Sequence, residues 1–381
     1  MKIFGANTLA ERVIQAELCS GCGACIDLCP YFRSYRGKTA HLFPCTREEG
    51  RCFAYCPKVE VDLDGLSRFL FAKPYDGHPL GNLRSIHVAR AGARVKRQQF
   101  QSGGTVSALI YFALRSKRIR GAILTGREGL LPVPRLVTRP ADVWRHGLSK
   151  YTAAPTLAAL NRAVAAGHEA LGVVATPCQA TAVAQMRMNP LQKSPFQDPT
   201  ALVIGLFCTW ALDFRKFEAF LAERVPLQDI VKVDIPPPPA SVLEVYLHEE
   251  KREFPLAEIR PLVPDTCGYC LDMTSEFADV SVGVLEGRPD LNTLIVRTER
   301  GEEIVREAQR QEYLIIEDMP AQNLEHLEWA AGNKKQRGLR RCMETGRLNG
   351  EAGMACLRLT GEVTGRILEN GIKGKESSCH I

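Results

Sequence analysis

Seven of the fourteen cysteines of this 381-residue chain fall within residues 19–56, and their spacing restricts what this segment can fold into. Cys19, Cys22 and Cys25 follow one another at two-residue gaps, and Cys29 directly precedes a proline. This spacing wraps three thiolates around one cuboidal iron–sulfur cluster and turns the cysteine before the proline towards another cluster. The segment therefore predicts an iron–sulfur domain that transfers single electrons.

The pairing rule for such motifs divides these cysteines between two predicted clusters. The first is expected to be held by Cys19, Cys22, Cys25 and Cys56, and the second to begin with Cys29, Cys45 and Cys52. The second set is one ligand short, because Leu42 stands where a further cysteine would complete the motif. The second cluster is therefore a three-iron cluster, uses another ligand such as His41, or is absent.

A zinc site and a disulfide framework are the alternative interpretations of this segment. Structural zinc prefers two separated Cys-x2-Cys or His pairs, and disulfides need an oxidising compartment. Glu11 and Arg12 interrupt the region where a secretion signal would be continuously apolar, so export is not expected. The many thiols then predict a cytoplasmic protein and favour iron–sulfur clusters over both alternatives.

Composition is that of an ordinary globular protein, with 45% hydrophobic and 24% charged residues. The longest apolar run, residues 201–212, is shorter than the roughly 20 residues that span a bilayer, so direct membrane insertion is not expected. The formal net charge of +6 is modest and spread out. Nucleic-acid binding needs a sharper basic cluster with aromatic residues, whereas a mild positive charge suits an anionic cofactor or an acidic protein partner.

The chain is expected to have three parts: a ferredoxin-like iron–sulfur domain (1–80), an α/β domain (81–320) and a helical tail (321–381). The first is rich in turn residues and ends in a predicted linker at Pro74–Gly81. In the second, buried strands alternate with amphipathic helices, as in α/β layers. The strands are predicted at 86–91, 122–125, 170–175, 202–207 and 242–248, the helices at 104–116, 155–166, 178–188 and 214–224, a further α/β segment at 277–318, and a long basic helix at 322–347.

A second set of cysteines lies at strand ends and in a tight turn: Cys178, Cys208, Cys267 and Cys270. Cys178 and Cys208 each follow an apolar strand, and loops at the carboxyl ends of strands converge on the ligand crevice of an α/β sheet. Four thiolates gathered there would hold another cluster. The alternative is that Cys178 and Cys208 are small buried hydrophobic residues, as free cysteines often are.

Three polar segments are candidates for ligand binding. Residues 101–107 place two glycines directly before a predicted helix, where backbone amides can hold phosphate or where the residues simply cap the helix. The segment Ser149–Thr152 contains the basic residue Lys150 and leads into a predicted helix. Asn292 and Thr293 begin a predicted strand. Either of these last two segments could instead be a surface loop, which is the safer interpretation from composition.

Taken together, these segments resemble the beta subunit of coenzyme F420-reducing hydrogenase and of formate dehydrogenase, with relatives in chlorophyll and sulfite reduction. Six stretches match in the right order and cover most of residues 85–310: 101–109, 149–157, 176–187, 205–210, 267–283 and 292–301. One departure is that Val284 follows Gly283, where the family often has Asp. This departure and the irregular second cysteine set leave the identity of the hydride carrier open.

The resemblance implies a mixed α/β (α+β) fold with a two-cluster ferredoxin-like domain before an FAD-binding α/β domain. It implies that Cys178, Cys208, Cys267 and Cys270 ligate a four-iron cluster beside the flavin. It also implies that Lys150 faces the FAD diphosphate or the reduced flavin. The residues expected to contact the flavin are Ser102, Gly103, Gly104, Thr105, Ser149, Lys150, Tyr151, Thr152, Thr176, Gln179, Asn292 and Thr293.

The implied activity is hydride exchange between a soluble carrier, coenzyme F420 or NAD(P)H, and FAD, with single electrons passing through two or three clusters. A flavin is needed because hydride carriers deliver two electrons and clusters pass one. The expected partners are redox subunits of a hydrogenase, formate dehydrogenase or heterodisulfide-reductase type. The alternatives are a non-catalytic electron-transfer adaptor and a reductase of an organic substrate such as a tetrapyrrole. Cys342, Cys356 and Cys379 are expected to be structural or surface thiols.

Overall fold

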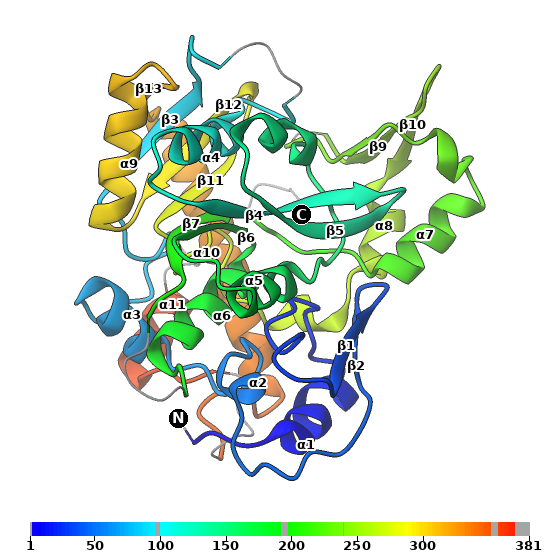
Figure 1. Cartoon of the computed structure of the whole chain (residues 1–381), viewed down its shortest axis with the longest axis vertical. Helices are drawn as coiled ribbons and strands as arrows, with labels where there is room; N and C mark the ends of the chain where they lie inside the picture. The colour runs from blue at the N-terminus through cyan, green and yellow to red at the C-terminus, as the bar shows by residue number, and fades with distance from the viewer. Residues whose placement is uncertain (1, 96–99, 192–196, 239, 352–356, 370–381) are drawn as a thin grey trace.

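The computed structural model describes residues 2–95, 100–191, 197–238, 240–351 and 357–369. Its centre is an eight-stranded mixed sheet with the strand order β13-β3-β12-β11-β7-β6-β4-β5, in which β11, β7, β6 and β4 run parallel (Figure 1). The strands are β3 (Ser85–Ala91), β4 (Gly121–Glu128), β5 (Leu131–Val137), β6 (Leu171–Ala175), β7 (Thr200–Leu206), β11 (Val280–Leu285), β12 (Arg288–Val296) and β13 (Leu314–Asp318).

Helices cover both faces of this sheet because its central strands are apolar on both sides. In β7, Val203 packs into one core and its neighbour Ile204 into the other, and both are fully buried. Such strands read as continuous hydrophobic runs. One face is covered by α4 (Thr105–Arg115) and α9 (Glu299–Arg310), and the opposite face by α5 (Thr156–Ala165) and α6 (Pro177–Met188).

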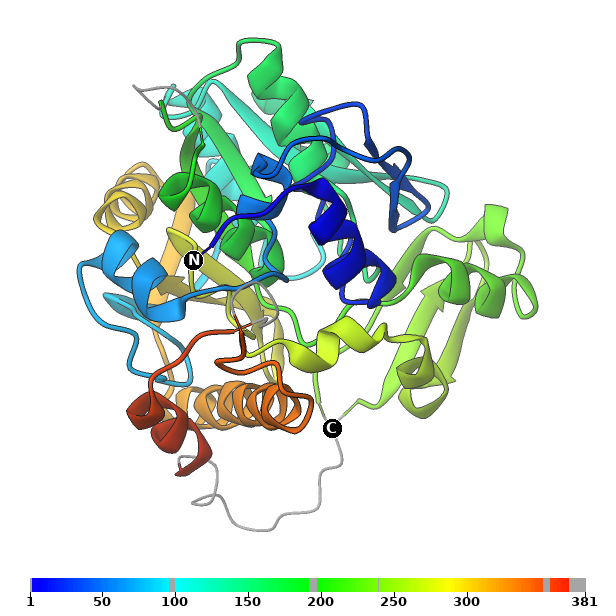
Figure 2. The ribbon, with the colours of Figure 1, turned by 90° about the horizontal axis from the view of Figure 1, so that it is seen from below.

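The amino-terminal region packs on the α5 and α6 face of the large sheet. Cys22, Ala24, Ala54 and Tyr55 share a core with α5 and α6, and Figure 2 shows this region crossing in front of those helices. Its elements are α1 (Ala6–Leu9), a π-helix (Ala10–Gln15), β1 (Phe32–Tyr35) paired with β2 (Lys38–His41), α2 (Arg51–Ala54) and α3 (Leu63–Phe71).

A smaller three-stranded sheet stands beside the large one and has its own core against α7 (Phe214–Ala222). It consists of β8 (Lys232–Asp234), β9 (Val242–Tyr246) and β10 (Lys251–Pro255), and the short helix α8 (Leu256–Ile259) follows. Short 3-10 helices occupy Pro140–His146, Leu227–Asp229, Arg260–Leu262 and Asp265–Tyr269. None of the helices in the described part of the chain is long and apolar enough to cross a membrane.

The long helix α10 (Ala321–Glu344) and the short α11 (Gly361–Glu369) pack together at the carboxyl end. α10 also packs against Asp265–Tyr269, the turn that contains Cys267. The approach is close because a Cβ at Gly338 would lie 2.7 Å from the Cys270 carbonyl oxygen. The long basic helix is therefore confirmed, and one of its faces is buried beside the paired cysteines.

The predicted mixed α/β architecture is confirmed, including the strands at β3, β4, β6, β7 and β9 and the helices α4 to α7. The interpretation of Pro74–Gly81 as a linker is wrong. Tyr75 and Leu80 are buried there, and the Leu80 carbonyl accepts a hydrogen bond from Arg297 at 2.7 Å. Turn residues predict a change of chain direction but not exposure. Here the turns pack against the buried hydrogen bonds of Arg297 and do not form an exposed linker.

Candidate redox site

The four cysteines assigned to the first cluster lie together in the structure. The pKa of the Cys25 thiol is well above its usual value because of burial and then because of Cys19, Cys22 and Cys56. Two glycines allow the tight loop between them: Gly21 and Gly23 have φ angles of 67° and 84°. A Cβ at Gly23 would lie 2.8 Å from the Pro155 carbonyl, so the loop packs directly on the start of α5. The four thiols therefore lie near one another where this loop packs on the large domain.

The second set brings three thiols together. Burial, followed by Cys29 and Cys45, raises the pKa of Cys52 to about 11. Leu42, at the position where a fourth cysteine would complete the motif, is 48% exposed. The His41 ring stacks on Phe32 with 4.8 Å between centroids, and its buried Nε2 has no hydrogen-bond partner among the described residues. This set has three thiols, and His41 keeps an unpaired nitrogen.

The four scattered cysteines also converge, from three parts of the chain. Burial raises the pKa of Cys208 to about 12, with further contributions from Cys267, Cys178 and Cys270. Cys178 lies in the first turn of α6, whose start is fixed by a capping box between Thr176 and Gln179. Cys208 follows β7, and its amide donates to the Met273 carbonyl at 2.9 Å. The carboxyl ends of β6 and β7 thus bring two thiols to the turn that holds the other two.

We name these sets the first group (Cys19, Cys22, Cys25, Cys56), the second group (Cys29, Cys45, Cys52) and the third group (Cys178, Cys208, Cys267, Cys270). Cys178 of the third group raises the pKa of Cys22, and Cys52 of the second group raises that of Cys25. The three groups therefore lie in series, with the first group in the middle. Sequence spacing does not reveal this order.

The described cysteines form no disulfides, so their sulfurs remain available as ligands. All twelve described cysteines are free thiols. Among the residues that the structure describes, no three His, Cys, Asp or Glu side chains are arranged to hold a single metal ion. Cys342 is fully buried in an apolar cluster, whereas Cys356 and Cys379 lie outside the described residues.

The glycine loop at the start of α4 packs tightly against strand β12. Asn292 accepts a hydrogen bond from the Thr105 amide at 3.2 Å and donates to Ser102 Oγ at 2.8 Å. A Cβ at Gly103 would lie 2.9 Å from Asn292 Oδ1, and Gly104 has a φ of 77°. Neither glycine can be replaced without strain. The structure therefore joins Ser102 to Thr105 with Asn292, whereas Thr293 is buried within β12 and pairs with β3.

The 149–152 segment is tied to this glycine loop by Gln101, whose side-chain oxygen accepts from the Ser149 amide at 3.2 Å. Lys150 Nζ donates to the carbonyls of His146, Gly147 and Leu148 at 3.0, 2.6 and 2.8 Å. Burial and then Arg127 lower the pKa of Lys150 to about 8. Its ammonium therefore lies within the loop with carbonyl partners.

Tyr151 and Thr152 point to the smaller sheet. The Tyr151 hydroxyl donates to Asp234 at 2.9 Å and accepts from the Ile235 amide at 3.0 Å. Thr152 is buried and forms an isolated bridge with Leu212. These two residues therefore anchor the segment, and the Tyr151 hydroxyl is already engaged.

Unpaired buried polar atoms collect around the Lys150 loop. Gln101 Nε2, Thr105 Oγ1 and His146 Nδ1 are buried without a hydrogen-bond partner among the described residues. Such atoms are rare in folded proteins, and each of them calls for a bound water, ion or ligand or for local strain. The donors, the two glycines and Lys150 fit an anionic, hydrogen-bonding cofactor.

Thr176 and Gln179 are satisfied within the protein. The Thr176 amide donates to Gln179 Oε1 at 2.8 Å, and Gln179 Nε2 donates to Ala154 O at 2.9 Å and to Thr156 Oγ1 at 3.0 Å. They connect the start of α6, next to Cys178, with the end of the 149–155 loop. These hydrogen bonds hold Cys178 of the third group at a fixed position relative to the Lys150 loop.

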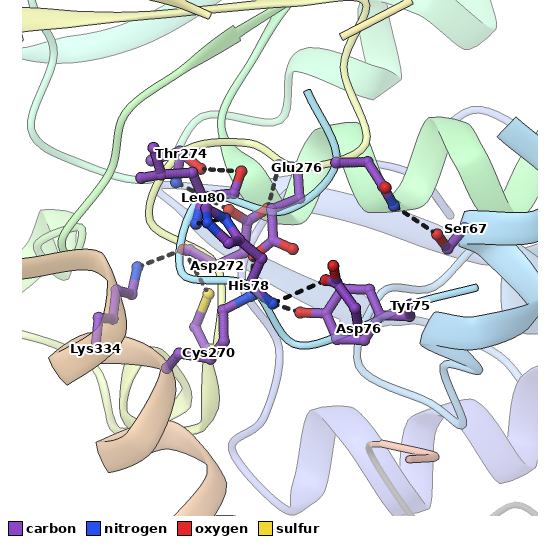
Figure 3. Close-up of polar contacts among 12 residues, drawn as sticks. Ser67, Tyr75, Asp76, His78, Leu80, Cys270, Asp272, Thr274, Glu276 and Lys334 are labelled. Carbon is purple, nitrogen blue, oxygen red and sulfur yellow. Dashed lines mark hydrogen bonds and ion pairs between the residues drawn. The ribbon is translucent and has the colours of Figure 1, made fainter. Parts of the chain in front are cut away.

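Two buried lysines beside the third group were not among the residues selected from the sequence. Lys334 of α10 donates to the carbonyls of Cys208 and Asp272 at 2.5 and 2.8 Å, and Figure 3 shows it reaching towards Asp272 on the side of Cys270. Lys58 donates to the Thr266 carbonyl at 3.0 Å, and its charge lowers the pKa of Cys267 against the effect of burial. In the sequence, Lys334 follows Ala331 by three residues, which places both on the apolar face of the predicted helix. This spacing is the sequence feature that indicates the burial of Lys334.

Comparison with known protein families follows the same division of the chain. Residues 86–161 and 168–322 match the amino-terminal and carboxyl-terminal parts of the family described as coenzyme F420 hydrogenase/dehydrogenase, beta subunit. Residues 12–31 match the 4Fe-4S binding domain. This last match covers the start of the first group.

Characterised relatives agree with these matches. The chain is 30% identical to the coenzyme F420 hydrogenase subunit beta of Methanothermobacter thermautotrophicus over 235 residues, which are 60% of this chain and 82% of that protein. It is also 30% identical to the coenzyme F420-dependent sulfite reductase of Methanocaldococcus jannaschii over 325 residues, 81% of this chain but only 49% of the relative, so the chain spans about half of that protein.

The fold is shared with a chain of the F420-reducing [NiFe] hydrogenase complex from Methanosarcina barkeri. The TM-score is 0.65 at 23% sequence identity, with 70% of this chain and 93% of that chain covered. The family matches cover more than half of the chain, and the match to the Methanothermobacter protein covers more than four-fifths of that relative. Both findings place the chain in one family. This protein is a member of the coenzyme F420 hydrogenase/dehydrogenase beta subunit family.

Proposed function

We propose that this protein is an iron–sulfur flavoprotein subunit that exchanges a hydride between a soluble carrier and FAD. Single electrons then pass between the FAD site and a partner redox subunit through clusters held by the three thiol groups, in either direction. Coenzyme F420 is the proposed carrier, because several relatives that match over most of their length are named for it. The observation that carries the proposal is the serial order of the groups within one fold: Cys22 of the first group packs with Cys178 of the third, and the other first-group cysteines pack with the second group.

The bound flavin would supply the conversion between a two-electron hydride and single electrons. We assign its site to the region of Ser102–Thr105, Asn292 and Lys150. There the glycines permit close approach of the backbone, and Gln101, Thr105 and His146 offer unpaired polar atoms. Lys150 supplies positive charge for a diphosphate. Ser149 is joined to the glycine loop through Gln101, so both segments would respond to the same ligand.

The third group is the proposed entry point for single electrons from the flavin. Gln179 links the start of α6, which carries Cys178, to Ala154 and Thr156 at the end of the Lys150 segment. The flavin region and the third group are therefore connected by two side-chain hydrogen bonds. The second group lies at the other end of the series, and we propose that the partner subunit docks there.

The proposal is tested by cofactor analysis of protein purified without oxygen. The protein should show flavin absorption and roughly eight to twelve irons, as expected for two or three cuboidal clusters. Cys208→Ala should remove about four irons. Cys342→Ala is the control, because Cys342 is a buried thiol that belongs to none of the groups, and it should remove none. A protein with zinc and no flavin would contradict the proposal.

A further inference from the structure

Two adjacent lysines of α10 are buried, and only one of them has a negatively charged partner. Lys334 is 5% exposed and Lys335 is 1% exposed. Lys335 Nζ lies 2.6 Å from Glu276 Oε1 and 2.6 Å from the Tyr75 hydroxyl. Its charge is therefore compensated inside the protein by an ion pair.

Lys334 has no such partner. Its ammonium donates only to the backbone carbonyls of Cys208 and Asp272, and no carboxylate of the described residues lies within 4 Å of it. The Asp272 carboxylate turns away and accepts from the amides of Thr274 and Glu276 at 2.9 and 2.8 Å (Figure 3). An ammonium buried without compensation is strongly unfavourable. Because Lys334 has no direct ion pair, the fold implies that further negative charge lies beside its ammonium.

The groups around Lys334 identify that source of charge. Cys270 and Cys208 of the third group interact most strongly with its ammonium, followed by the Asp272 carboxylate, which does not pair with it directly, and by Cys267. Four thiolates around a cuboidal iron–sulfur cluster leave a net negative charge, and this charge grows by one unit on reduction. Gly338, one turn further along α10, lets the helix backbone come close to Cys270, so the helix is shaped to bring this charge to the site.

We propose that Lys334 is the counter-charge of the cluster held by the third group and raises its reduction potential. The inference rests on the function proposed above, and it concerns a residue outside the family-matching segments, which end at residue 322. Net charge and hydrogen bonding near a cluster are among the factors that set its potential. A fixed positive charge stabilises the reduced cluster more than the oxidised one, so electron entry at the third group becomes more favourable.

The charge can be removed while the hydrogen bonds are kept. Lys334→Gln retains two N–H donors for the two carbonyls but is neutral, and Lys334→Arg keeps the charge. The matched control is the double variant Lys335→Met with Glu276→Gln, because it removes one buried charge of each sign from the neighbouring position. Iron content and the potential of each cluster are measured by an anaerobic redox titration followed by electron paramagnetic resonance.

We expect Lys334→Gln to shift the one-electron reduction equilibrium of the third-group cluster at least tenfold towards the oxidised form, about 59 mV lower in potential. The Arg variant and the control should stay within about threefold of the original protein. The signal is assigned to the third group because Cys208→Ala abolishes it. If Lys334→Gln loses its iron, Lys334→Met and Lys334→Arg are titrated in the same way. A Met variant that keeps both its iron and the original potential of the third-group cluster overturns the inference.

Failure of this inference is distinguishable from failure of the proposed function. An intact cluster with an unchanged potential in Lys334→Gln contradicts the role of Lys334 and leaves the cluster assignment standing. If the unaltered protein has no iron that Cys208→Ala removes, the cluster assignment itself is wrong, and the role of Lys334 fails with it.

Discussion

The thiol of Cys22, in the amino-terminal cysteine motif, lies beside the thiol of Cys178, in the first turn of α6. After burial, Cys178 is the largest cause of the rise in the pKa of Cys22 to about 12. This contact joins the ferredoxin-like region to the α/β domain at the point where two groups of four thiols meet. In our account it is the step by which electrons pass between the two parts of the chain.

The serial order predicts that loss of the first group separates the other two. Cys56→Ala should remove about four irons and leave flavin reduction by the carrier intact, because the flavin region and the third group are unchanged. Electron delivery to an artificial acceptor that reacts at the second group should fall at least tenfold. Rapid mixing with absorbance detection of both steps tests this, with Cys342→Ala as the control. Unchanged delivery in Cys56→Ala would show that the groups do not act in series.

Lys150 predicts that FAD binding weakens at alkaline pH. Its pKa is lowered to about 8 in the cofactor-free fold, so the side chain loses its charge as the pH rises through that value. The affinity for FAD should therefore decrease between pH 7 and pH 9. Lys150→Arg should bind with little dependence on pH over this range, and Lys150→Met weakly throughout. Fluorescence quenching of FAD measures this, and an equal pH dependence in the Arg and original proteins would exclude Lys150 as the cause.

The same lowered pKa has a consequence for stability. Between its folded value of about 8 and its ordinary value of 10.5, the unfolded chain binds more protons at this site than the folded protein does. This contribution to stability is fully present above the unfolded value and is lost as the pH falls towards 8. Denaturation of the FAD-free protein between pH 8 and 10.5 should show a rising contribution that is absent from Lys150→Met.

Gly103 predicts a packing defect that also affects the flavin site. A Cβ there would lie 2.9 Å from Asn292 Oδ1 and 3.0 Å from the Asp290 carbonyl, both within a tightly paired region. Gly103→Ala should destabilise the protein by about 1–3 kcal/mol, as overpacking does, and lower its FAD content. Gly365→Ala is the control, because a Cβ meets nothing within 4 Å there and alanine favours the helix. Equal thermal melting of the two variants would contradict this packing argument.

The Lys335–Glu276 pair predicts a large effect from a single charge removal. Lys335→Met leaves Glu276 buried without its partner and should destabilise the protein by about 3–5 kcal/mol. Adding Glu276→Gln should restore much of the loss. The exposed pair Arg84–Glu302 should contribute less than about 1 kcal/mol when Arg84 becomes Ala. Urea denaturation of the original protein and of these three variants gives the changes in unfolding free energy. A mild effect of Lys335→Met alone would show that the ion pair is not important for stability.

The sequence predicts the central strands well because they are continuous apolar runs, as in the stretch from Leu171 to Ala175. The edge strand β5 is not predicted from the sequence, because Pro132 and Pro134 are unfavourable inside a strand. At the edge of the sheet one side of a strand has no partner, and its prolines need no ladder hydrogen bond there. Local patterns therefore identify the interior of the sheet better than its border.

The candidate site shows the same limit. Spacing suggests which cysteines form the first and second groups, because those ligands are neighbours in the chain. The contact between Cys22 and Cys178 depends on how the two regions pack, and no local pattern encodes it. Lys334 is visible in the sequence only as one of several basic residues on a long helix, and its burial follows from the docking of α10 against Cys270.

The most direct test of the central claim is an anaerobic titration of the iron-loaded protein with reduced coenzyme F420 and, separately, with NADH. Flavin absorbance and the electron paramagnetic resonance signals of the clusters are followed together. We predict that reduced coenzyme F420 bleaches the flavin band and that reduced-cluster signals then appear. Cys208→Ala should retain the bleaching but lose the third-group signal, and bleaching by NADH alone would contradict coenzyme F420 as the carrier. A protein whose flavin band responds to neither carrier, or which holds no flavin, would contradict the account.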